Sequence, residues 1–344
     1  MRSPSSTPST ACAQVPEIEE YLPAARAALA AFGLPETEPH PIGKSENVVF
    51  RADAPDGTRW ALRLHRPGYH ALPALESDRE LTAHLAACGM IVPTGRRTTG
   101  GAWYTEVQTP DPEGSRLAGM TLWHPGQTLA DLIEEDRGPE TWSWFERTGA
   151  LLADLHNATA GWTPPPAFTR HRLDLDGLVG ETPFWGRFWE AVCLTADERQ
   201  TLSKARDLVA ARLAALSDPL VLIHADAHPA NVLVSGNRLG LIDFDDCAWG
   251  WPIFDIAVAL RSAWGEPHFT GLRDSLLTGY TSRRALPPDV LAQLDLFLLT
   301  RSLMLISWCA DRPEVAGEPA EWKPGLIAKV RAALEHQAGS SARA

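Results

Sequence analysis

Residues 222–246 read LIHADAHPANVLVSGNRLGLIDFDD, and this stretch decides both the fold and the chemistry that we expect. Two apolar runs, 232–234 and 239–242, flank the turn-forming tripeptide Ser-Gly-Asn at 235–237. Short apolar runs separated by such a turn predict a β-hairpin. We expect the turn of this hairpin to be centred on Asn237.

Three polar residues of this stretch form a candidate reaction site. A hairpin centred on Asn237 sets Asn231 opposite Asp243, and opposed residues point to the same face of a sheet. An amide oxygen and a carboxylate side by side suit a hard divalent cation such as Mg²⁺. Asp226, on the loop before the hairpin, is left as a candidate base. The arrangement predicts phosphoryl transfer.

The spacing around Asp226 supports this prediction. His224, Asp226 and Asn231 follow the order His-x-Asp-x-x-x-x-Asn, which is the spacing of a kinase catalytic loop. Asp226 would then orient the acceptor hydroxyl and take its proton late in the transfer. Asn231 would hold a metal ion or position Asp226, and Asp243 would bridge the metal to the β- and γ-phosphates. The alternative is a polar loop between two core strands, because His, Asp and Asn are common turn residues.

The composition of the chain limits the number of domains and the classes of partner that we expect. The chain has 344 residues, 44% of them hydrophobic and 22% charged, which fits about two globular domains. A net charge of −12 argues against a nucleic-acid or anionic-membrane partner and is compatible with a cationic substrate. The five cysteines are scattered without CxxC spacing, so we expect no zinc site, no disulfide framework and a cytoplasmic location. No apolar run reaches the roughly 18 residues of a membrane span.

The periodicity of apolar residues divides the chain into two parts. In the first part we expect helices at 17–32 and 72–88 and strands at 38–43, 46–53, 59–66, 102–108 and 117–123. Beyond Pro125-Gly126 we expect mainly helices, at 127–135, 140–157, 196–216, 252–264, 269–280, 288–310 and 324–337. The predicted organisation is a disordered tail at 1–15, an N-terminal nucleotide-binding lobe at 16–122, and a C-terminal helical lobe at 123–344 with the catalytic loop and the acceptor site.

Several segments carry a family resemblance. His-Ala-Asp-Ala-His-Pro-Ala-Asn at 224–231, followed by Ile-Asp-Phe-Asp-Asp at 242–246, resembles the signature of the aminoglycoside phosphotransferase and choline kinase family. Gly-Trp-Pro-Ile-Phe-Asp-Ile-Ala at 250–257 resembles the G-x-P-x-x-D-[IL]-A segment of that family. Ile-Asp-Phe-Asp-Asp at 242–246, together with Leu-Arg-Leu-His-Arg-Pro at 62–67, looks most like a bacterial subgroup that includes homoserine-kinase-like and stress-response-kinase-like members.

This resemblance implies an α+β, two-lobed protein-kinase-like fold. A small antiparallel sheet with one helix would precede a larger, mostly helical lobe. The resemblance also implies ATP and Mg²⁺ as cofactors, with transfer of the ATP γ-phosphate to a hydroxyl of a small-molecule acceptor. Asp255 is implied to be a structural group that anchors the catalytic loop.

The resemblance further implies which residues hold the nucleotide. Trp-Ala-Leu-Arg at 60–63 lies where a kinase has Val-Ala-Ile-Lys, so Ala61 would cover the adenine and Arg63 would reach the α- and β-phosphates. Arginine departs from the usual lysine of the family, which keeps the charge but changes the geometry. Glu80 is the expected partner of Arg63, and Glu76, one turn earlier, is the rival.

Two loops complete the implied nucleotide site. Loop 43–47 lies where the family covers the phosphates, with Ser45 and Asn47 as candidate contacts, although a plain β-turn explains the same residues. The stretch 120–126, which includes Leu122, resembles the hinge whose backbone groups bind adenine.

Some polar and aromatic residues near these motifs have a structural role or an acceptor-binding role as alternatives. We expect His156 to be structural and His228 to brace the catalytic loop. Trp249 and Trp251 form either a face for a cationic acceptor or part of a helical core. The acidic pair at 245–246 either lines the acceptor pocket or is solvated.

Two other activities fit the same motifs. One is a serine/threonine protein kinase of the bacterial subgroup, although no segment ending in Ala-Pro-Glu follows Asp243. The other is a pseudokinase that binds nucleotide as a scaffold. The presence of Asp226, Asn231 and Asp243 argues against a pseudokinase, and only Arg63 favours it.

Overall fold

The computed structural model describes residues 16–45, 47–112, 114–135, 139–217 and 219–341. The tail predicted at 1–15 lies outside them. The chain divides into two compact units, Met1–Tyr69 with Arg96–Thr121 and His70–Gly95 with Leu122–Ala344. The helix predicted at 72–88 therefore groups with the second unit.

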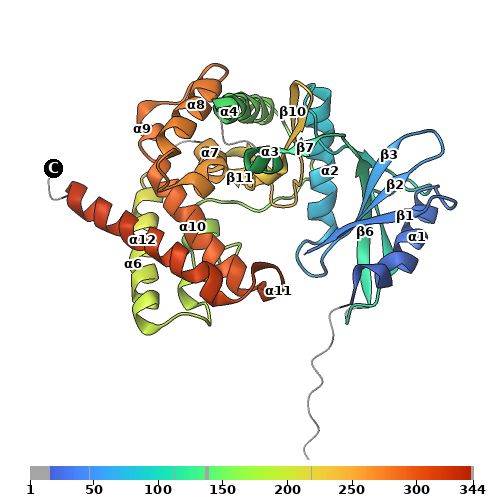
Figure 1. The fold of residues 1–344 in the computed structure, drawn as a ribbon, viewed down its shortest axis with the longest axis horizontal. Helices are drawn as coiled ribbons and strands as arrows, with labels where there is room; N and C mark the ends of the chain where they lie inside the picture. Colours follow the sequence, from blue (N-terminus) through green and yellow to red (C-terminus); the bar gives the residue numbers. More distant parts are fainter. Residues whose placement is uncertain (1–15, 46, 113, 136–138, 218, 342–344) are drawn as a thin grey trace, which may run out of the picture. The chain divides into compact units, whose positions relative to one another are not determined.

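The first unit is built on a β-sheet with one α-helix packed against it (Figure 1). The strand order is β1-β2-β3-β6-β4, and β5 pairs antiparallel with β6. The strands are β1 Pro39–Lys44, β2 Val48–Asp53, β3 Arg59–Leu64, β4 Gly95–Arg96, β5 Tyr104–Gln108 and β6 Ser115–Leu122. A 3₁₀ turn, Ile18–Tyr21, leads into α1, Leu22–Ala31.

Alternation of side chains explains how this sheet forms a core. Val48, Phe50 and Ala52 of β2 are buried while their neighbours are more exposed, which is the period-two pattern of a strand with one covered face. Leu62 and Leu64 of β3 follow the same pattern, and α1 contributes buried residues to the same core.

The second unit is mostly helical. Its helices are α2 Leu72–Ala87, α3 Leu129–Glu135, α4 Pro139–Ala160, α5 Leu175–Val179, α6 Ala196–Leu213, α7 Pro252–Leu260, α8 Phe269–Thr281, α9 Pro288–Leu291, α10 Leu294–Ala310, α11 Pro313–Ala316 and α12 Pro319–Ser341. Short 3₁₀ turns lie at Phe188–Glu190, Pro229–Asn231 and Arg261–Ala263. Two small sheets contain β7 Gln127–Thr128, β8 Val221–Ile223, β9 Val232–Ser235, β10 Arg238–Leu241 and β11 Ala248–Gly250. The predicted α+β fold class is confirmed.

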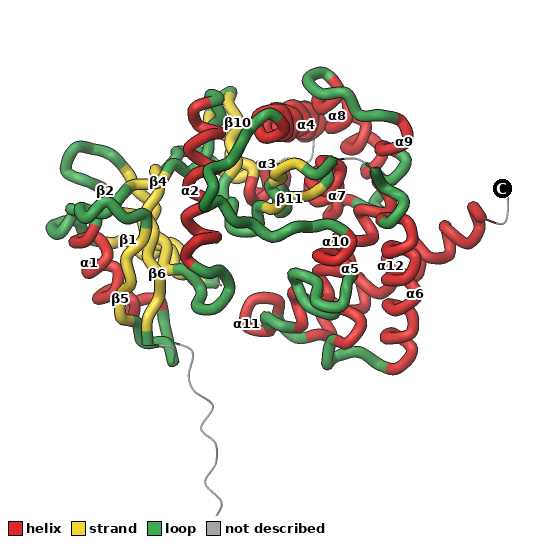
Figure 2. The backbone as a smooth tube through the Cα atoms, turned by 180° about the vertical axis from the view of Figure 1, so that it is seen from behind, coloured by secondary structure: helices red, strands yellow, loops and turns green. Residues whose placement is uncertain are grey.

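Helix α10 runs through the core of the second unit and packs against α7 and α12 (Figures 1 and 2). Among the described residues, the segment Pro288–Ala310 is the one that is long and apolar enough to cross a membrane. Because 67% of its most apolar window is buried inside the protein, the segment has the character of a core helix.

Helices α4 and α8 cross at very short range because glycines face each other. A Cβ atom at Gly149 would lie 1.9 Å from the carbonyl oxygen of Leu276, and one at Gly279 would lie 1.7 Å from that of Glu146. No side chain fits at either position. This crossing brings α4 and α8 together, and each of them contributes one residue to the network described next.

Candidate active site

The loop between β8 and β9 is held by Asp255 of α7, whose side chain is fully buried. The backbone N–H groups of His224 and Ala225 donate to its two oxygens at 2.9 and 2.7 Å. His156 Nε2 lies 3.0 Å from the same carboxylate, and His156 Nδ1 accepts from the Tyr280 hydroxyl at 3.0 Å. These contacts agree with the structural roles expected for Asp255 and His156.

Two residues of the site have a strained backbone. Ala225 has φ 66° and Asp243 has φ 63°, and they are the non-glycine residues of the described chain with positive φ. Such conformations cost on the order of 1–3 kcal/mol and persist where the surroundings impose them. Asp255 binds the N–H of Ala225 and thereby turns the chain immediately before Asp226.

Asp226 is surrounded by donors. Arg301 Nη2 donates to its Oδ1, and Asn231 Nδ2 donates to its Oδ2 at 3.2 Å and to its backbone carbonyl at 2.9 Å. His228 Nε2 lies 3.4 Å from Oδ2. Burial raises the pKa of Asp226, but the charge of Arg301 and the hydrogen bond and charge of His228 outweigh burial and lower the pKa. Asp226 is therefore an ionised carboxylate near neutral pH.

His224 connects this loop to the segment that carries Asp243. Its Nε2 is 2.9 Å from the carbonyl oxygen of Ile242, while its Nδ1 accepts the N–H of Asp226 at 3.3 Å. Its ring also packs at 4.5 Å, between centroids, from that of Phe244. One side chain thus fixes the spacing between the Asp226 loop and the residues on both sides of Asp243.

The predicted hairpin is present, but its predicted register is wrong by one residue. Val232 pairs with Leu241, so the turn is centred between Gly236 and Asn237 and not on Asn237. Gly236 has φ 57°, as a two-residue hairpin turn requires. Asn231 therefore lies opposite Ile242, whose N–H donates to the Asn231 carbonyl at 3.0 Å. Asp243 lies just beyond the strand, and its direction is set by its positive φ.

Asn231 and Asp243 suit a divalent cation even without the predicted pairing. Because Asn231 Nδ2 donates to Asp226, Oδ1 is turned away, and no donor among the described residues reaches it. The described residues contain no group of three His, Cys, Asp or Glu side chains that could hold a metal ion by themselves. One amide and one carboxylate are typical of Mg²⁺ sites in which phosphate and water supply the other ligands.

A model of the phosphotransferase enzyme family matches residues 36–294. The chain belongs to this family. The match includes the whole Asp226 loop and the segment around Asp243, as the resemblance read from the sequence implied. This phosphotransferase is an enzyme, a small-molecule kinase.

Sequence relatives of this phosphotransferase include a homoserine kinase of Sinorhizobium fredii, 34% identical over 196 residues. That match covers 51% of this chain and 55% of the relative. An uncharacterized protein of Synechocystis is 27% identical over 255 residues, covering 72% of this chain and 66% of the relative. This chain thus spans about half to two thirds of the length of these relatives.

Among solved structures, this phosphotransferase resembles a microcompartment-associated aminopropanol kinase, with a TM-score of 0.75 and 28% identity. The likeness covers 90% of this chain and 94% of the other. An amicoumacin kinase in complex with AMP-PNP and Ca²⁺ shares the fold, with a TM-score of 0.70, 18% identity and coverage of 87% and 88%.

Four of the predicted nucleotide residues lie in the first unit of this phosphotransferase. Ala61 and Arg63 are half-buried on β3, where they pair with Arg51 and Val49. Asn47 has a local role, because its Oδ1 accepts the backbone N–H of Arg66 at 3.0 Å. Its carbonyl accepts the N–H of Ser45 at 3.0 Å and closes the turn between β1 and β2. These bonds favour the β-turn interpretation for Asn47.

The other two predicted nucleotide residues lie in the second unit. Glu80 is half-buried on α2, as is its rival Glu76. Leu122 already donates its N–H to the Thr94 carbonyl at 2.9 Å, so its own carbonyl is the group that it could offer to a ligand.

The structure distinguishes the two interpretations of Trp251 and of Asp245 by their burial. Trp251 is buried and its ring lies 5.8 Å from that of Phe297, which favours the core interpretation. Asp245 is buried as well, so this member of the acidic pair is not solvated.

Arg301, which contacts Asp226 from α10, was not predicted from the sequence. The two residues are 75 positions apart, and no motif links them. A signal was nevertheless present, because Arg301 is the charged residue within the mostly apolar stretch 296–306. Arginine is rarely buried without a partner, so such an interruption indicates an ion pair or a ligand site.

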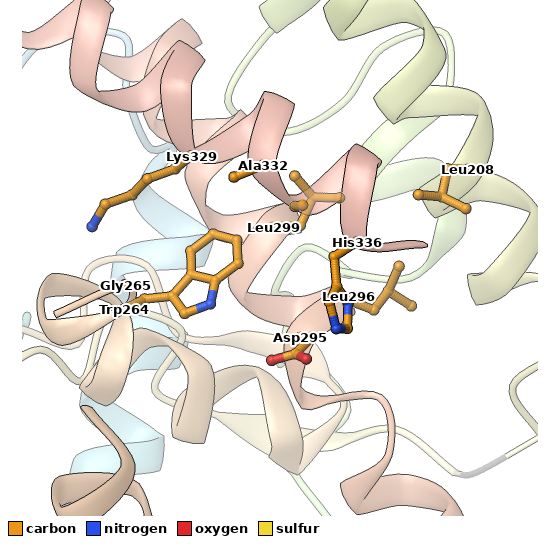
Figure 3. Close-up of a pocket in the computed structure, with 10 residues that line it drawn as sticks. Leu208, Trp264, Gly265, Asp295, Leu296, Leu299, Lys329, Ala332 and His336 are labelled. Carbon is orange, nitrogen blue, oxygen red and sulfur yellow. The ribbon is translucent and has the colours of Figure 1, made fainter. Parts of the chain in front are cut away.

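A cavity of about 250 Å³ lies among α6, α10 and α12 and contains none of the predicted site residues (Figure 3). Trp264, Leu296 and Leu299 supply much of its apolar lining. In this view Lys329 lies at the left and His336 near the centre. Burial and the charge of Arg261 lower the pKa of Lys329.

Proposed function

We propose that this phosphotransferase moves the γ-phosphate of ATP, bound with Mg²⁺, to a hydroxyl of a small molecule, and that Asp226 is its catalytic base. The observation that carries the proposal is the contact of Asp226 with Asn231 in a strained loop anchored by Asp255. The alternative, a polar surface loop without a catalytic role, does not explain why the buried carboxylate of Asp255 holds the backbone of this loop.

Asp226 would accept a hydrogen bond from the acceptor hydroxyl and hold its oxygen in line with the γ-phosphate. Its lowered pKa keeps it ionised, so it can take the hydroxyl proton as the bond to phosphorus forms. Asn231 would fix the orientation of the carboxylate through Nδ2. Positioning of this kind supplies most of the rate enhancement in phosphoryl transfer.

Asn231 Oδ1 and the carboxylate of Asp243 would hold Mg²⁺, which when bound neutralises charge on the phosphate oxygens. Arg63 would contact the α- and β-phosphates, with Glu80 as its partner. Ala61 and the carbonyl of Leu122 would contact the adenine, and Ser45 would face the phosphates.

The relatives support a small acceptor. Proteins named homoserine kinase and aminopropanol kinase are similar to this chain, and both names denote short hydroxyl compounds. Neither name identifies the acceptor of this chain.

The test is ADP release by the full chain with ATP, Mg²⁺ and a panel of short hydroxyl compounds, with protein acceptors as a separate arm. We expect acceptor-dependent turnover with a small molecule and none with protein. Asp243→Asn should weaken nucleotide binding that depends on Mg²⁺, measured as the shift in melting temperature.

Two results would contradict the proposal. Phosphorylation of protein but of no small molecule would make this chain a protein kinase. A nucleotide-induced melting shift without turnover on any acceptor, unchanged in Asp226→Asn, would make it a nucleotide-binding scaffold.

A further inference from the structure

Two arginines approach Asp226, and only one of them is paired with it. Arg301 donates to Asp226 through Nη2 alone, and its side chain is 9% exposed. Arg261, in the turn after α7, makes no side-chain hydrogen bond or ion pair with any described residue. The local charge of the two guanidiniums and the one carboxylate is therefore positive.

Other groups around Arg261 do not remove this positive charge. Burial and the charge of Arg301 together lower the pKa of Arg261 to about 10, while Cys309 and Asp226 oppose the shift. Lys329 of α12 also lies within electrostatic range of Arg261. Arg301 and Arg261 are adjacent cations held together by the packing of α10 against the end of α7.

A buried donor beside Arg301 also has no partner. The guanidinium carbon of Arg301 lies 5.5 Å from the centre of the Trp185 ring. Trp185 is 4% exposed, and its indole N–H has no hydrogen-bond acceptor among the described residues. Buried donors are almost always paired in folded proteins, so an unpaired one beside the guanidinium of Arg301 points to a bound acceptor group.

The chemistry that fits these donors is a carboxylate. Guanidinium binds carboxylate with two parallel hydrogen bonds, and Nε and Nη1 of Arg301 donate to no described residue. An ammonium group at this position would instead be repelled by two guanidiniums. The cationic acceptor that the net charge of the chain allows is therefore disfavoured at this point of the site.

We propose that Arg301 and Arg261, with the indole N–H of Trp185, bind a carboxylate of the acceptor, so that the substrate class is a short hydroxy acid. This inference rests on the proposed function, because it places the acceptor hydroxyl against Asp226. Arg301 touches Asp226 directly, so a carboxylate on Arg301 and a hydroxyl on Asp226 belong to a molecule only a few bonds long.

Three acceptors that differ by one group each test the proposal. L-homoserine carries a carboxylate and an ammonium, γ-hydroxybutyrate lacks the ammonium, and propanolamine lacks the carboxylate. With ATP and Mg²⁺, we expect kcat/KM for the two carboxylates to exceed that for propanolamine by about 100-fold or more, since a site built for a polar group rejects the analogue without it.

Variants of the two arginines separate binding from folding. Arg301→Met should raise KM for γ-hydroxybutyrate about 100-fold and lower the ratio of kcat/KM for γ-hydroxybutyrate to kcat/KM for propanolamine by about as much, while Arg301→Lys should restore part of the loss. Arg261→Met should act in the same direction without removing a bond to Asp226. Arg273→Met is the matched control, because Arg273 is an exposed arginine paired with Asp274 in the same unit.

The outcomes distinguish this inference from the proposed function. If propanolamine is the best acceptor, or if both arginine variants reduce the use of all three compounds equally, the inference is wrong and the kinase function stands. If no compound is phosphorylated, binding of γ-hydroxybutyrate in the presence of ADP is measured as a shift in the melting temperature of the protein. A shift with γ-hydroxybutyrate that Arg301→Met abolishes supports the carboxylate site while the proposed function fails, and the absence of any shift overturns the site.

Discussion

Each unit of this phosphotransferase contains a shielded Asp–Arg pair, and the two pairs are built differently. In the first unit, Arg116 donates to both oxygens of Asp111 through Nε and Nη2, at 2.6 and 2.8 Å, and Tyr21 adds a third bond at 2.5 Å. In the second unit, Arg301 donates to Asp226 through one nitrogen.

This difference in geometry separates a structural pair from a reactive one. Asp111 and Arg116 are 5 residues apart, and Arg116 lies in β6. The guanidinium of Arg116 binds both oxygens of the Asp111 carboxylate. Asp226 is 21% exposed, and the charge of Arg261 acts on it. Its partner Arg301 lies beside the ring of Trp185. Neither the guanidinium of Arg261 nor the indole N–H of Trp185 has a hydrogen-bond partner among the described residues. A pair whose donors and acceptors are all used stabilises the fold, whereas one with donors left over can bind a ligand.

The largest effect is expected at the reactive pair. Asp226→Asn keeps the shape but removes the base, so turnover should fall by about 10³-fold. Nucleotide binding should be preserved, because Asp226 is not assigned to the nucleotide. ADP release and the nucleotide-induced shift in melting temperature measure the two quantities. Asp274→Asn, at an exposed ion pair, is the control, and an Asp226→Asn enzyme that retains normal turnover contradicts the assignment.

The next effect is expected at the anchor beneath the loop. Asp255→Asn replaces one acceptor oxygen by an amide that faces donors, so it should lower the free energy of unfolding by about 2–4 kcal/mol. Denaturant titration measures this loss. Unchanged stability would show that the bonds from His224 and Ala225 do not hold the loop.

The structural pair predicts a specific dependence on acid. Burial by itself raises the pKa of Asp111, but the hydrogen bonds from Arg116 and Tyr21 and the charge of Arg116 bring it down from 3.8 to about 2. The stabilisation is therefore complete above pH 4 and is lost as the pH falls from about 4 to about 2, with a size of about 2 kcal/mol. Asp111→Asn should remove this part of the pH dependence, measured by unfolding at several pH values. If the unfolding free energy of the variant depends on pH between about 4 and about 2 as that of the unmodified protein does, the role given to Asp111 is contradicted.

The smallest effect is expected at the outer edge of the anchor. Tyr280→Phe removes the hydroxyl that donates to His156 Nδ1 and should cost about 1 kcal/mol of unfolding free energy. Turnover should change little, because Asp255 keeps its bonds to the loop. A loss of turnover as large as that of Asp226→Asn would mean that the anchor takes part in the reaction.

Local patterns in the sequence predicted the α+β fold and the presence of the hairpin correctly, whereas the roles of Asp226, Asn231 and Asp243 stay predictions. These features depend on residues close together in the chain, where alternation and turn chemistry act. The register of the hairpin was wrong, because the residues at 235–238 allow a two-residue loop, as observed, as well as the three-residue loop that centring on Asn237 implies. The positive φ angles of Ala225 and Asp243 could not be predicted from the sequence, since neither alanine nor aspartate requires this conformation.

Long-range partners could not be predicted in the same way. Arg301 and Trp185 meet only through the packing of the second unit, so no spacing rule connects them to Asp226. Arg301 could have been noticed as a charge in an apolar helix, but its partner could not. The cytoplasmic location and the roles of Arg63 and Glu80 stay predictions.

The most direct test of the account compares Asp226→Asn with Asp111→Asn in one set of turnover and unfolding measurements. We predict that Asp226→Asn lowers turnover about 10³-fold and unfolding free energy by no more than about 1 kcal/mol. Asp111→Asn should lower the unfolding free energy by about 2 kcal/mol and leave turnover within about threefold. Equal losses of turnover in the two variants, or a larger loss in Asp111→Asn, would contradict the separation of a reactive from a structural pair.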